Sequence, residues 1–195
     1  MNTRFIPLIL MFALAGCNAA PEPAQAPPLA GARIGGPFTL TNQDGAQVTD
    51  KDFVGRYRIV YFGYTFCPDV CPVDVQAIGA GLKTFETAAP ALGAKIVPIF
   101  VSVDPARDKP AELKQFVAAF HPRMVGLTGT KEQIDAATKA YGIYYAIDPP
   151  APGGGYLVQH SRQAYLMAPD GSPMALLPAE QGPQAVADEL KRWVK

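Results

Sequence analysis

Two cysteines lie four residues apart in the stretch YFGYTFCPDVCPVD, which covers residues 61–74. Each is followed by a proline, and a proline disfavours helical backbone at the residue before it, so we expect Cys67 and Cys71 to lie in a turn. Pro72 suits the first position of a helix, where a missing N–H costs nothing. The dithiol is therefore predicted at a helix N-terminus, where free N–H groups and the helix dipole favour the thiolate that attacks disulfides and binds metals.

A structural role for the dithiol is weakly supported, because a disulfide that closes a loop of a few residues removes little entropy from the unfolded chain. The chain has 2 histidines that could complete a chemical site. His121 comes at a predicted helix end, where a histidine often satisfies terminal carbonyls. His160 follows a Gly-rich loop and precedes a predicted hairpin, a junction from which its side chain could reach the dithiol. A packed surface histidine is an equal alternative for His160.

Two sulfurs and one imidazole nitrogen would form a soft ligand set. Thiolates select Cu(I), zinc or iron–sulfur clusters over hard cations. Structural zinc takes four protein ligands, whereas a three-coordinate site fits Cu(I). Met124, Met167 and Met174 are interpreted as core or strand residues, although a thioether could assist copper. A dithiol without the imidazole would instead support thiol–disulfide exchange.

The elements that must position these residues alternate between strands and helices. Residues 58–62 are β-branched and aromatic, which predicts a buried strand that leads directly into the dithiol. Apolar residues then recur at helical spacing, at Val75, Ile78, Leu82 and Phe85. Further strands are predicted at 95–103, with an irregularity at Pro98, and at 124–127, and helices at 110–120 and 130–141.

A polar turn, DPARD at residues 104–108, follows the strand at 95–103. In open α/β sheets the carboxyl ends of strands are where sites gather. Two interpretations of Asp108 stay open: it caps the helix at 110–120, or it lies beside the dithiol. Asp104 is a candidate for supporting a ligand from this turn.

The remaining segments complete an α/β layout. Residues 143–147 predict a strand, and a mobile Pro/Gly loop at 148–155 then leads to the segment 156–161, which carries His160. The PDGS sequence between 164–167 and 174–177 predicts a hairpin. A helix is expected at 183–193. The predicted fold is thus a central mixed β-sheet flanked by helices, with an N-terminal hairpin and a C-terminal β-hairpin plus helix.

The first residues predict export and anchoring. Arg4 and the apolar run at 5–15 indicate a signal peptide that is too short to span a bilayer. LAGC, ending at Cys17, resembles the lipobox of bacterial lipoproteins, so residues 1–17 are interpreted as a signal cleaved before a lipidated Cys17. Residues 18–36 are rich in Ala and Pro and predict a disordered tether before one domain at 37–195. With 17 basic and 17 acidic residues, nothing indicates a nucleic-acid partner.

Five ordered segments resemble the Sco/SenC family: FGYTFCPDVCPVD, SVDPARD, GLTGT, KAYGIYYA and HS…YLMAPDG. The resemblance implies a thioredoxin-like fold and a copper-binding protein that helps to assemble the copper A centre of cytochrome c oxidase subunit II. By matching motifs, Cys67, Cys71 and His160 take the positions of the copper ligands, for Cu(I) and, as a second state, Cu(II). The implied location is the periplasmic side of a bacterial membrane, and a further copper chaperone or thiol reductase is a possible partner.

One residue departs from the family pattern. Family members usually carry Asp immediately before the ligand histidine, where this chain has Gln159. A carboxylate there can orient the imidazole, and the loss of a group that supports a metal ligand costs on the order of 10–100-fold in affinity or activity. We therefore expect Cu(I) binding to tolerate Gln159 better than Cu(II) binding. A thiol–disulfide oxidoreductase that reduces the cysteines of the oxidase copper site is the alternative function, with Cys67 and Cys71 as its redox dithiol.

Overall fold

The computed structural model describes residues 25–195 of the chain. The strands are β1 (Thr39–Asn42), β2 (Gln47–Thr49), β3 (Tyr57–Gly63), β4 (Ile96–Ser102), β5 (Val125–Thr128), β6 (Tyr145–Ile147), β7 (Val158–His160), β8 (Ala164–Met167) and β9 (Pro173–Leu177). The helices are α1 (Val70–Ala88), α2 (Pro90–Gly93), α3 (Pro110–Phe120), α4 (Lys131–Ala140) and α5 (Pro183–Trp193), with short 3-10 turns at Asp50–Phe53 and Ala179–Gln181. The predicted signal peptide, Cys17 and residues 18–24 of the tether lie outside the described residues.

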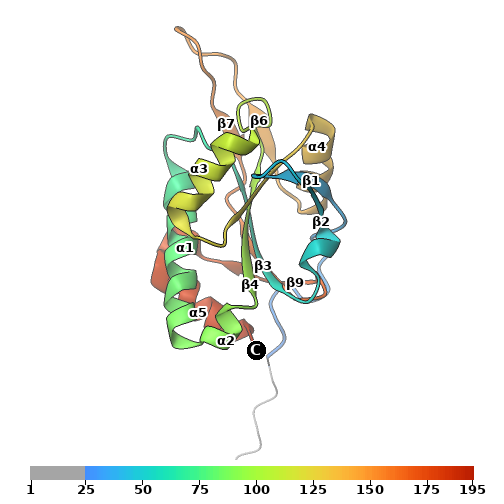
Figure 1. The fold of residues 1–195 in the computed structure, drawn as a ribbon, viewed down its shortest axis with the longest axis vertical. Helices are drawn as coiled ribbons and strands as arrows, with labels where there is room; N and C mark the ends of the chain where they lie inside the picture. Colours follow the sequence, from blue (N-terminus) through green and yellow to red (C-terminus); the bar gives the residue numbers. More distant parts are fainter. Residues whose placement is uncertain (1–24) are drawn as a thin grey trace, which may run out of the picture.

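A seven-stranded mixed sheet forms the centre of the domain, in the order β2-β1-β5-β4-β3-β8-β9. Strands β3, β4 and β5 are parallel, and every other pairing in this sheet is antiparallel. In Figure 1, α1, α3 and α5 lie on one side of the sheet and α4 lies on the other. The predicted α/β fold with its two terminal hairpins and last helix is confirmed.

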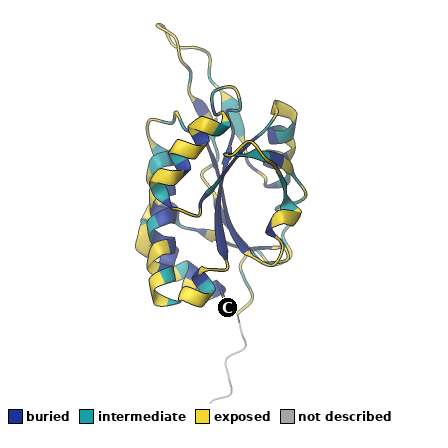
Figure 2. Ribbon diagram, viewed as in Figure 1, coloured by how far each residue is buried: buried dark blue, intermediate teal, exposed yellow. Residues whose placement is uncertain are grey.

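The core lies on both faces of the central strands, because all seven residues of β3 and all seven of β4 are buried (Figure 2). The apolar positions predicted for the helix after the dithiol are also buried: Val75, Ile78, Leu82 and Phe85. Met124 and Met167 are buried and Met174 packs against the core, as interpreted from the sequence. Pro98 causes no bulge, since its register with Ile59 is continuous with the rest of the β3–β4 pairing.

The segment before β1 differs from the disordered tether expected over 18–36. The Leu29 N–H donates to the Met174 carbonyl at 2.9 Å, and the Gly35 N–H donates to the Ala140 carbonyl at 2.9 Å. Leu29 and Ile34 pack against the core, which gives residues 25–36 apolar and hydrogen-bonding anchors that composition alone did not indicate. Within residues 25–195, no helix is both long and apolar enough to cross a membrane.

The parallel strands bring two turns together at their carboxyl ends. Gly63, the last residue of β3, is in register with Ser102, the last residue of β4. The Val103 N–H donates to the Gly63 carbonyl at 2.8 Å just beyond that pair. The turn that carries Cys67 and the turn at 104–108 therefore start from adjacent positions. The β6–β7 hairpin projects from the end of the domain opposite to the C-terminus (Figure 1).

Candidate metal centre

Both cysteines lie where β3 passes into α1. Cys67 is half-buried in the turn, and Cys71 is fully buried in the first turn of α1. The helix starts at Val70, earlier than predicted, so Pro72 is its third residue. The first N–H groups of a helix have no partner inside it, which is why this proline is tolerated there. The free N–H of Cys71 instead donates to the Cys67 sulfur at 3.5 Å, so Cys67 acts as an acceptor at the helix N-terminus.

At Cys71, burial opposes the thiolate that the helix N-terminus was expected to favour. Burial raises the pKa of the Cys71 thiol far above its ordinary value, and the nearby Cys67 raises that pKa further. Desolvation of the charged form outweighs the helix dipole at this position. Its sulfur is also closely packed, because a Cβ added at Gly63 would lie 3.1 Å from it. The Cys71 thiol therefore needs a bound cation, more than the dipole, to replace its proton.

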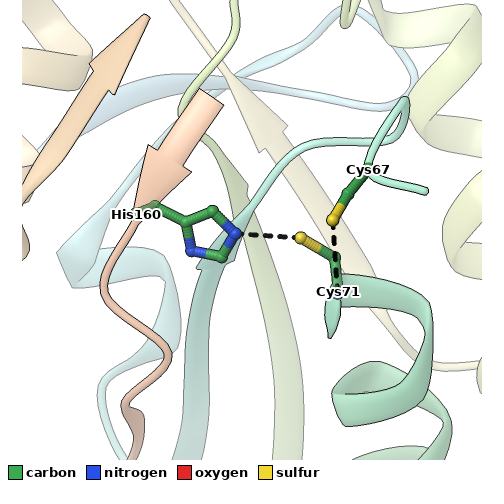
Figure 3. A group of neighbouring side chains, drawn as sticks. All are labelled: Cys67, Cys71 and His160. Carbon is green, nitrogen blue, oxygen red and sulfur yellow. Dashed lines mark hydrogen bonds between the residues drawn. The ribbon is translucent and has the colours of Figure 1, made fainter. Parts of the chain in front are cut away.

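His160, at the end of β7, reaches the dithiol from a distant part of the chain. Its Nε2 atom lies 3.0 Å from the Cys71 sulfur. Figure 3 shows the imidazole pointing toward that sulfur. The Nδ1 atom lies 2.8 Å from the Ser161 carbonyl, which can only accept, so Nδ1 carries the proton and Nε2 presents a lone pair. The rings of Tyr61 and Tyr64 contact the imidazole edge-on, at centroid distances of 6.2 and 6.0 Å. Burial lowers the pKa of His160, which favours the neutral imidazole that a metal requires.

The two sulfurs and the imidazole nitrogen form a compact donor set. The ligand atoms of Cys67, Cys71 and His160 all lie within 4.8 Å of one another. Two metal–sulfur bonds of about 2.3 Å span at most about 4.6 Å, so one ion could contact all three with small adjustments. This is the one such group of His, Cys, Asp and Glu side chains found within residues 25–195. Two soft sulfurs and one nitrogen, without a fourth protein ligand, suit copper.

Asp108 supports the dithiol turn and does not cap the following helix. Its buried carboxylate accepts hydrogen bonds from the Thr65 N–H at 3.0 Å, the Thr65 hydroxyl at 2.6 Å and the Ser102 hydroxyl at 2.6 Å. The N-cap residue of α3 is Lys109, which makes no side-chain capping bond. Of the two interpretations of Asp108, the role beside the dithiol is thus the one that the structure shows.

Neither Asp104 nor Gln159 contacts the three candidate ligands. Residues alternate between the two faces of a strand, so Gln159 points away from His160, and its amide donates to Asp148 at 2.8 Å. The group that orients the imidazole is instead the backbone carbonyl of Ser161. Asp104 is completely buried and bonds to Arg107 and to Tyr156, which precedes His160 by four residues.

A buried carboxylate that the sequence analysis missed links the two halves of the site. Asp74, in α1, accepts hydrogen bonds from Arg162 Nε at 3.0 Å and Nη2 at 2.8 Å, and from the Tyr61 hydroxyl at 2.9 Å. Arg162 comes two residues after His160, so this ion pair fastens the histidine segment to the helix of Cys71. The sequence did contain a signal for this ion pair. Asp74 directly precedes Val75 in a helix predicted to be buried on that side, and a buried carboxyl group requires a partner.

His121 lies at the C-terminal end of α3 and is structural, as predicted, but its ring bonds to Arg123 and Glu86 and not to the terminal carbonyls of the helix. The side chain is buried, Nδ1 accepts a hydrogen bond from the Arg123 N–H at 3.2 Å, and Nε2 lies 3.4 Å from a Glu86 oxygen. Since Nδ1 accepts, Nε2 carries the proton of the neutral ring. Burial lowers the pKa of His121, and the carboxylate of Glu86 opposes that shift.

This histidine predicts a pH dependence of stability. The folded pKa lies below the unfolded value of 6.5, so above pH 6.5 both states are neutral and the contribution is flat. As pH falls below 6.5 the unfolded chain takes up a proton first, and the free energy of unfolding should decrease until the folded pKa is reached. In the His121→Gln variant, whose amide can replace both hydrogen bonds, we expect a shallower decrease in urea titrations between pH 7 and 5. An unchanged slope would assign the effect elsewhere.

Comparisons with known proteins agree over the whole described domain. The sequence model described as SCO1/SenC matches residues 26–195. Protein SenC of Rhodobacter capsulatus is 45% identical over 161 residues, covering 83% of this chain and 71% of that protein. Mitochondrial SCO1 of Saccharomyces cerevisiae is 38% identical over 163 residues, covering 83% of this chain and 54% of that protein. The chain thus spans about half the length of the yeast relative.

Solved structures show the same relationship. ScoI of Bradyrhizobium japonicum, determined with copper bound, superposes with a TM-score of 0.74 at 37% identity, covering 83% of this chain and 99% of that one. BsSco, described as a member of the Sco family of cytochrome c oxidase assembly proteins with a disulfide switch, has a TM-score of 0.56 at 28% identity and covers 82% and 92%. The thioredoxin domain of a thiol-disulfide oxidoreductase from Bacteroides vulgatus, with a TM-score of 0.58 at 18% identity over 83% and 96%, shares the fold alone. The fold is therefore thioredoxin-like, and the chain belongs to the SCO1/SenC family.

Proposed function

We propose that this protein is a copper chaperone that binds copper through Cys67, Cys71 and His160 and delivers it to the copper A centre of cytochrome c oxidase subunit II. The observation that carries the proposal is the convergence of two sulfurs and one lone-pair nitrogen within 4.8 Å. It is supported by the copper in the Bradyrhizobium structure and by the description of BsSco as an oxidase assembly protein.

Copper is the cargo in this proposal, so the site must release it as well as bind it. Cys67 and His160 are half-buried, whereas Cys71 has no exposed surface. An incoming thiolate of the partner can therefore replace Cys67 or His160 first, with Cys71 as the last ligand to leave. Stepwise exchange of this kind moves the metal between proteins without free copper.

The proposal includes a location and a domain organisation. A signal at residues 1–17 is cleaved before Cys17, which is lipidated, and residues 18–24 link the anchor to the packed segment at 25–36 and the domain at 37–195. The chaperone then acts on the periplasmic side of a bacterial membrane. A periplasmic thiol reductase or a second copper chaperone would keep its dithiol reduced or loaded.

A second candidate function is thiol–disulfide exchange with the cysteines of the oxidase copper site. Cys67 is the more exposed of the two cysteines and would be the one to meet a substrate disulfide, and its sulfur accepts the Cys71 N–H. The buried Cys71 would then resolve the mixed disulfide. Its raised pKa works against this step, because an attacking thiol must first lose its proton.

One comparison separates the two functions. A form that starts after Cys17 should bind one Cu(I) per chain, and the His160→Ala variant should bind it more weakly while it reduces an oxidised copper-site peptide at the parent rate. If His160→Ala leaves Cu(I) affinity unchanged, the three-ligand site is wrong. A peptide-reduction rate no better than that of free thiol would remove the reductase function.

A further inference from the structure

The β6–β7 hairpin that carries His160 is joined to the rest of the domain mainly by side chains. Its two strands pair with each other and with no strand of the seven-stranded sheet. The hairpin is closed at its base by the Ser161 N–H, which donates to the Tyr144 carbonyl at 2.9 Å. Its tip is exposed, as Figure 2 shows. The position of His160 relative to the dithiol therefore depends on side-chain contacts, among them the packing of Val158 in the core and the Arg162–Asp74 ion pair.

Arg107 makes two further contacts with this hairpin, both to Tyr156, four residues before His160. The guanidinium donates from Nη1 to the Tyr156 carbonyl at 2.9 Å. The guanidinium carbon also lies 3.7 Å from the centroid of the Tyr156 ring, well within the range of a cation–π contact. One side chain thus holds both the backbone and the ring of Tyr156.

Asp104 holds Arg107 and Tyr156 at the same time. Its carboxylate, which has no exposed surface, accepts a hydrogen bond from Arg107 Nε and a second, at 2.8 Å, from the Tyr156 hydroxyl. A buried carboxylate is stable only where its oxygens are paired in this way. The turn after β4 therefore forms a binding site for Tyr156 of the hairpin.

The same guanidinium also contacts the turn that carries Cys67. Its carbon lies 5.1 Å from the centroid of the Phe66 ring and 5.5 Å from that of Tyr64. The Tyr64 ring in turn contacts the imidazole of His160 edge-on. Arg107 thus lies between the two halves of the metal site and touches both, although it contacts none of the three ligands.

We propose that Arg107 is a positioning residue of the copper site: fixed by Asp104, it latches Tyr156 and so keeps His160 beside Cys71. When the latch opens, the hairpin carries His160 away and leaves copper on the two sulfurs, which is the state from which a partner can take it. This inference rests on the proposed copper function. It assigns a role to Asp104 that acts through Tyr156 and not through direct contact with a ligand.

The test is a double-mutant cycle on the full chain. Arg107→Gln should lower Cu(I) affinity, measured by competition with a Cu(I) chelator, on the order of 10-fold, within the range seen when supporting residues of metal sites are removed. In the His160→Ala background the same substitution should change the affinity less than twofold, since a residue that acts through His160 has no effect once the imidazole is gone. Equal losses in both backgrounds would overturn the proposal.

Amide hydrogen exchange in the metal-free protein provides an independent readout. Arg107→Gln and Tyr156→Phe should speed exchange in residues 145–160, while exchange in β3 and β4 stays at the parent rate. Tyr144→Phe is the matched control, because it removes a hydroxyl from the same hairpin at a side chain that is 63% exposed. If Arg107→Gln unfolds the protein, the double variant Asp104→Asn/Arg107→Gln is used in its place, because it leaves no unpaired carboxylate buried. If exchange in the hairpin is unchanged in Arg107→Gln, the latch is overturned. If exchange is faster in Arg107→Gln but the His160→Ala variant binds Cu(I) with the parent affinity, the latch stands and only the proposed copper site is overturned.

Discussion

Cys71→Ser is expected to lower the Cu(I) affinity of the protein by more than about 100-fold, beyond the range for residues that only support a ligand. A hydroxyl is a hard, weakly acidic donor, and Cu(I) selects soft sulfur. Serine has nearly the shape of cysteine, so it can occupy the space against Gly63 and remain a partner for the His160 nitrogen. The fold should therefore survive while the metal site is lost.

The measurement is anaerobic competition with a Cu(I) chelator, with near-ultraviolet circular dichroism to confirm native packing. Cys67→Ser is the comparison, and we expect its loss to be as large or slightly smaller, since Cys67 is half-buried and water can replace it. His160→Ala should cost less than either, because two thiolates remain. Cu(I) affinity of Cys71→Ser within tenfold of the parent would mean that copper does not bind at this dithiol.

Local signals drew attention to the two cysteines, whereas for His160 they left a packed surface histidine as an equal alternative. The prolines after Cys67 and Cys71 and the apolar run before them predict a turn between a strand and a helix, which the structure has. Only Cys67 lies in that turn, however, because α1 begins at Val70 and includes Cys71. The Gly-rich loop before His160 predicts a junction, and the ordered family motifs indicate its partner. Periodicity also gave the buried faces of the helices, because a repeat of 3.6 residues is a property of the local sequence.

What the sequence did not reveal depends on which side chains meet across the fold. Asp108 was as plausible for a helix cap as for the dithiol turn, since only the packing of β3 beside β4 brings Thr65 and Ser102 to it. The effect of burial on the Cys71 thiol was missed for a similar reason. A helix N-terminus can be recognised in a sequence, but the burial that outweighs its dipole cannot.

Two arginines hold the segments on either side of His160. Before it, Arg107 holds Tyr156, and after it Arg162 pairs with Asp74 in the helix of Cys71. Both contacts include a buried carboxylate: that of Asp104, which holds Arg107, has no exposed surface, and that of Asp74 is 1% exposed. The Arg162–Asp74 pair therefore holds the segment after His160 to the helix that carries Cys71.

Arg162→Met is expected to lower the free energy of unfolding by about 2 kcal/mol, because it leaves the charge of Asp74 buried with a single partner, the Tyr61 hydroxyl. Loss of one partner from a fully buried pair costs about 3–5 kcal/mol. We expect less here, since the Arg162 side chain is 45% exposed and water can reach the vacated position. Urea denaturation of the metal-free protein gives the value directly.

The matched control is Arg192→Met, which removes an arginine of 63% exposure that pairs with Glu189 at 3.3 Å. Such surface pairs contribute about 0–1 kcal/mol, so this variant should differ from the parent by less than half as much as Arg162→Met. Adding Asp74→Asn to Arg162→Met should recover part of the loss, because the uncompensated charge is then gone while the Tyr61 hydroxyl keeps an acceptor. Equal destabilisation by the two arginine variants would show that the Asp74 pair does not anchor the His160 segment.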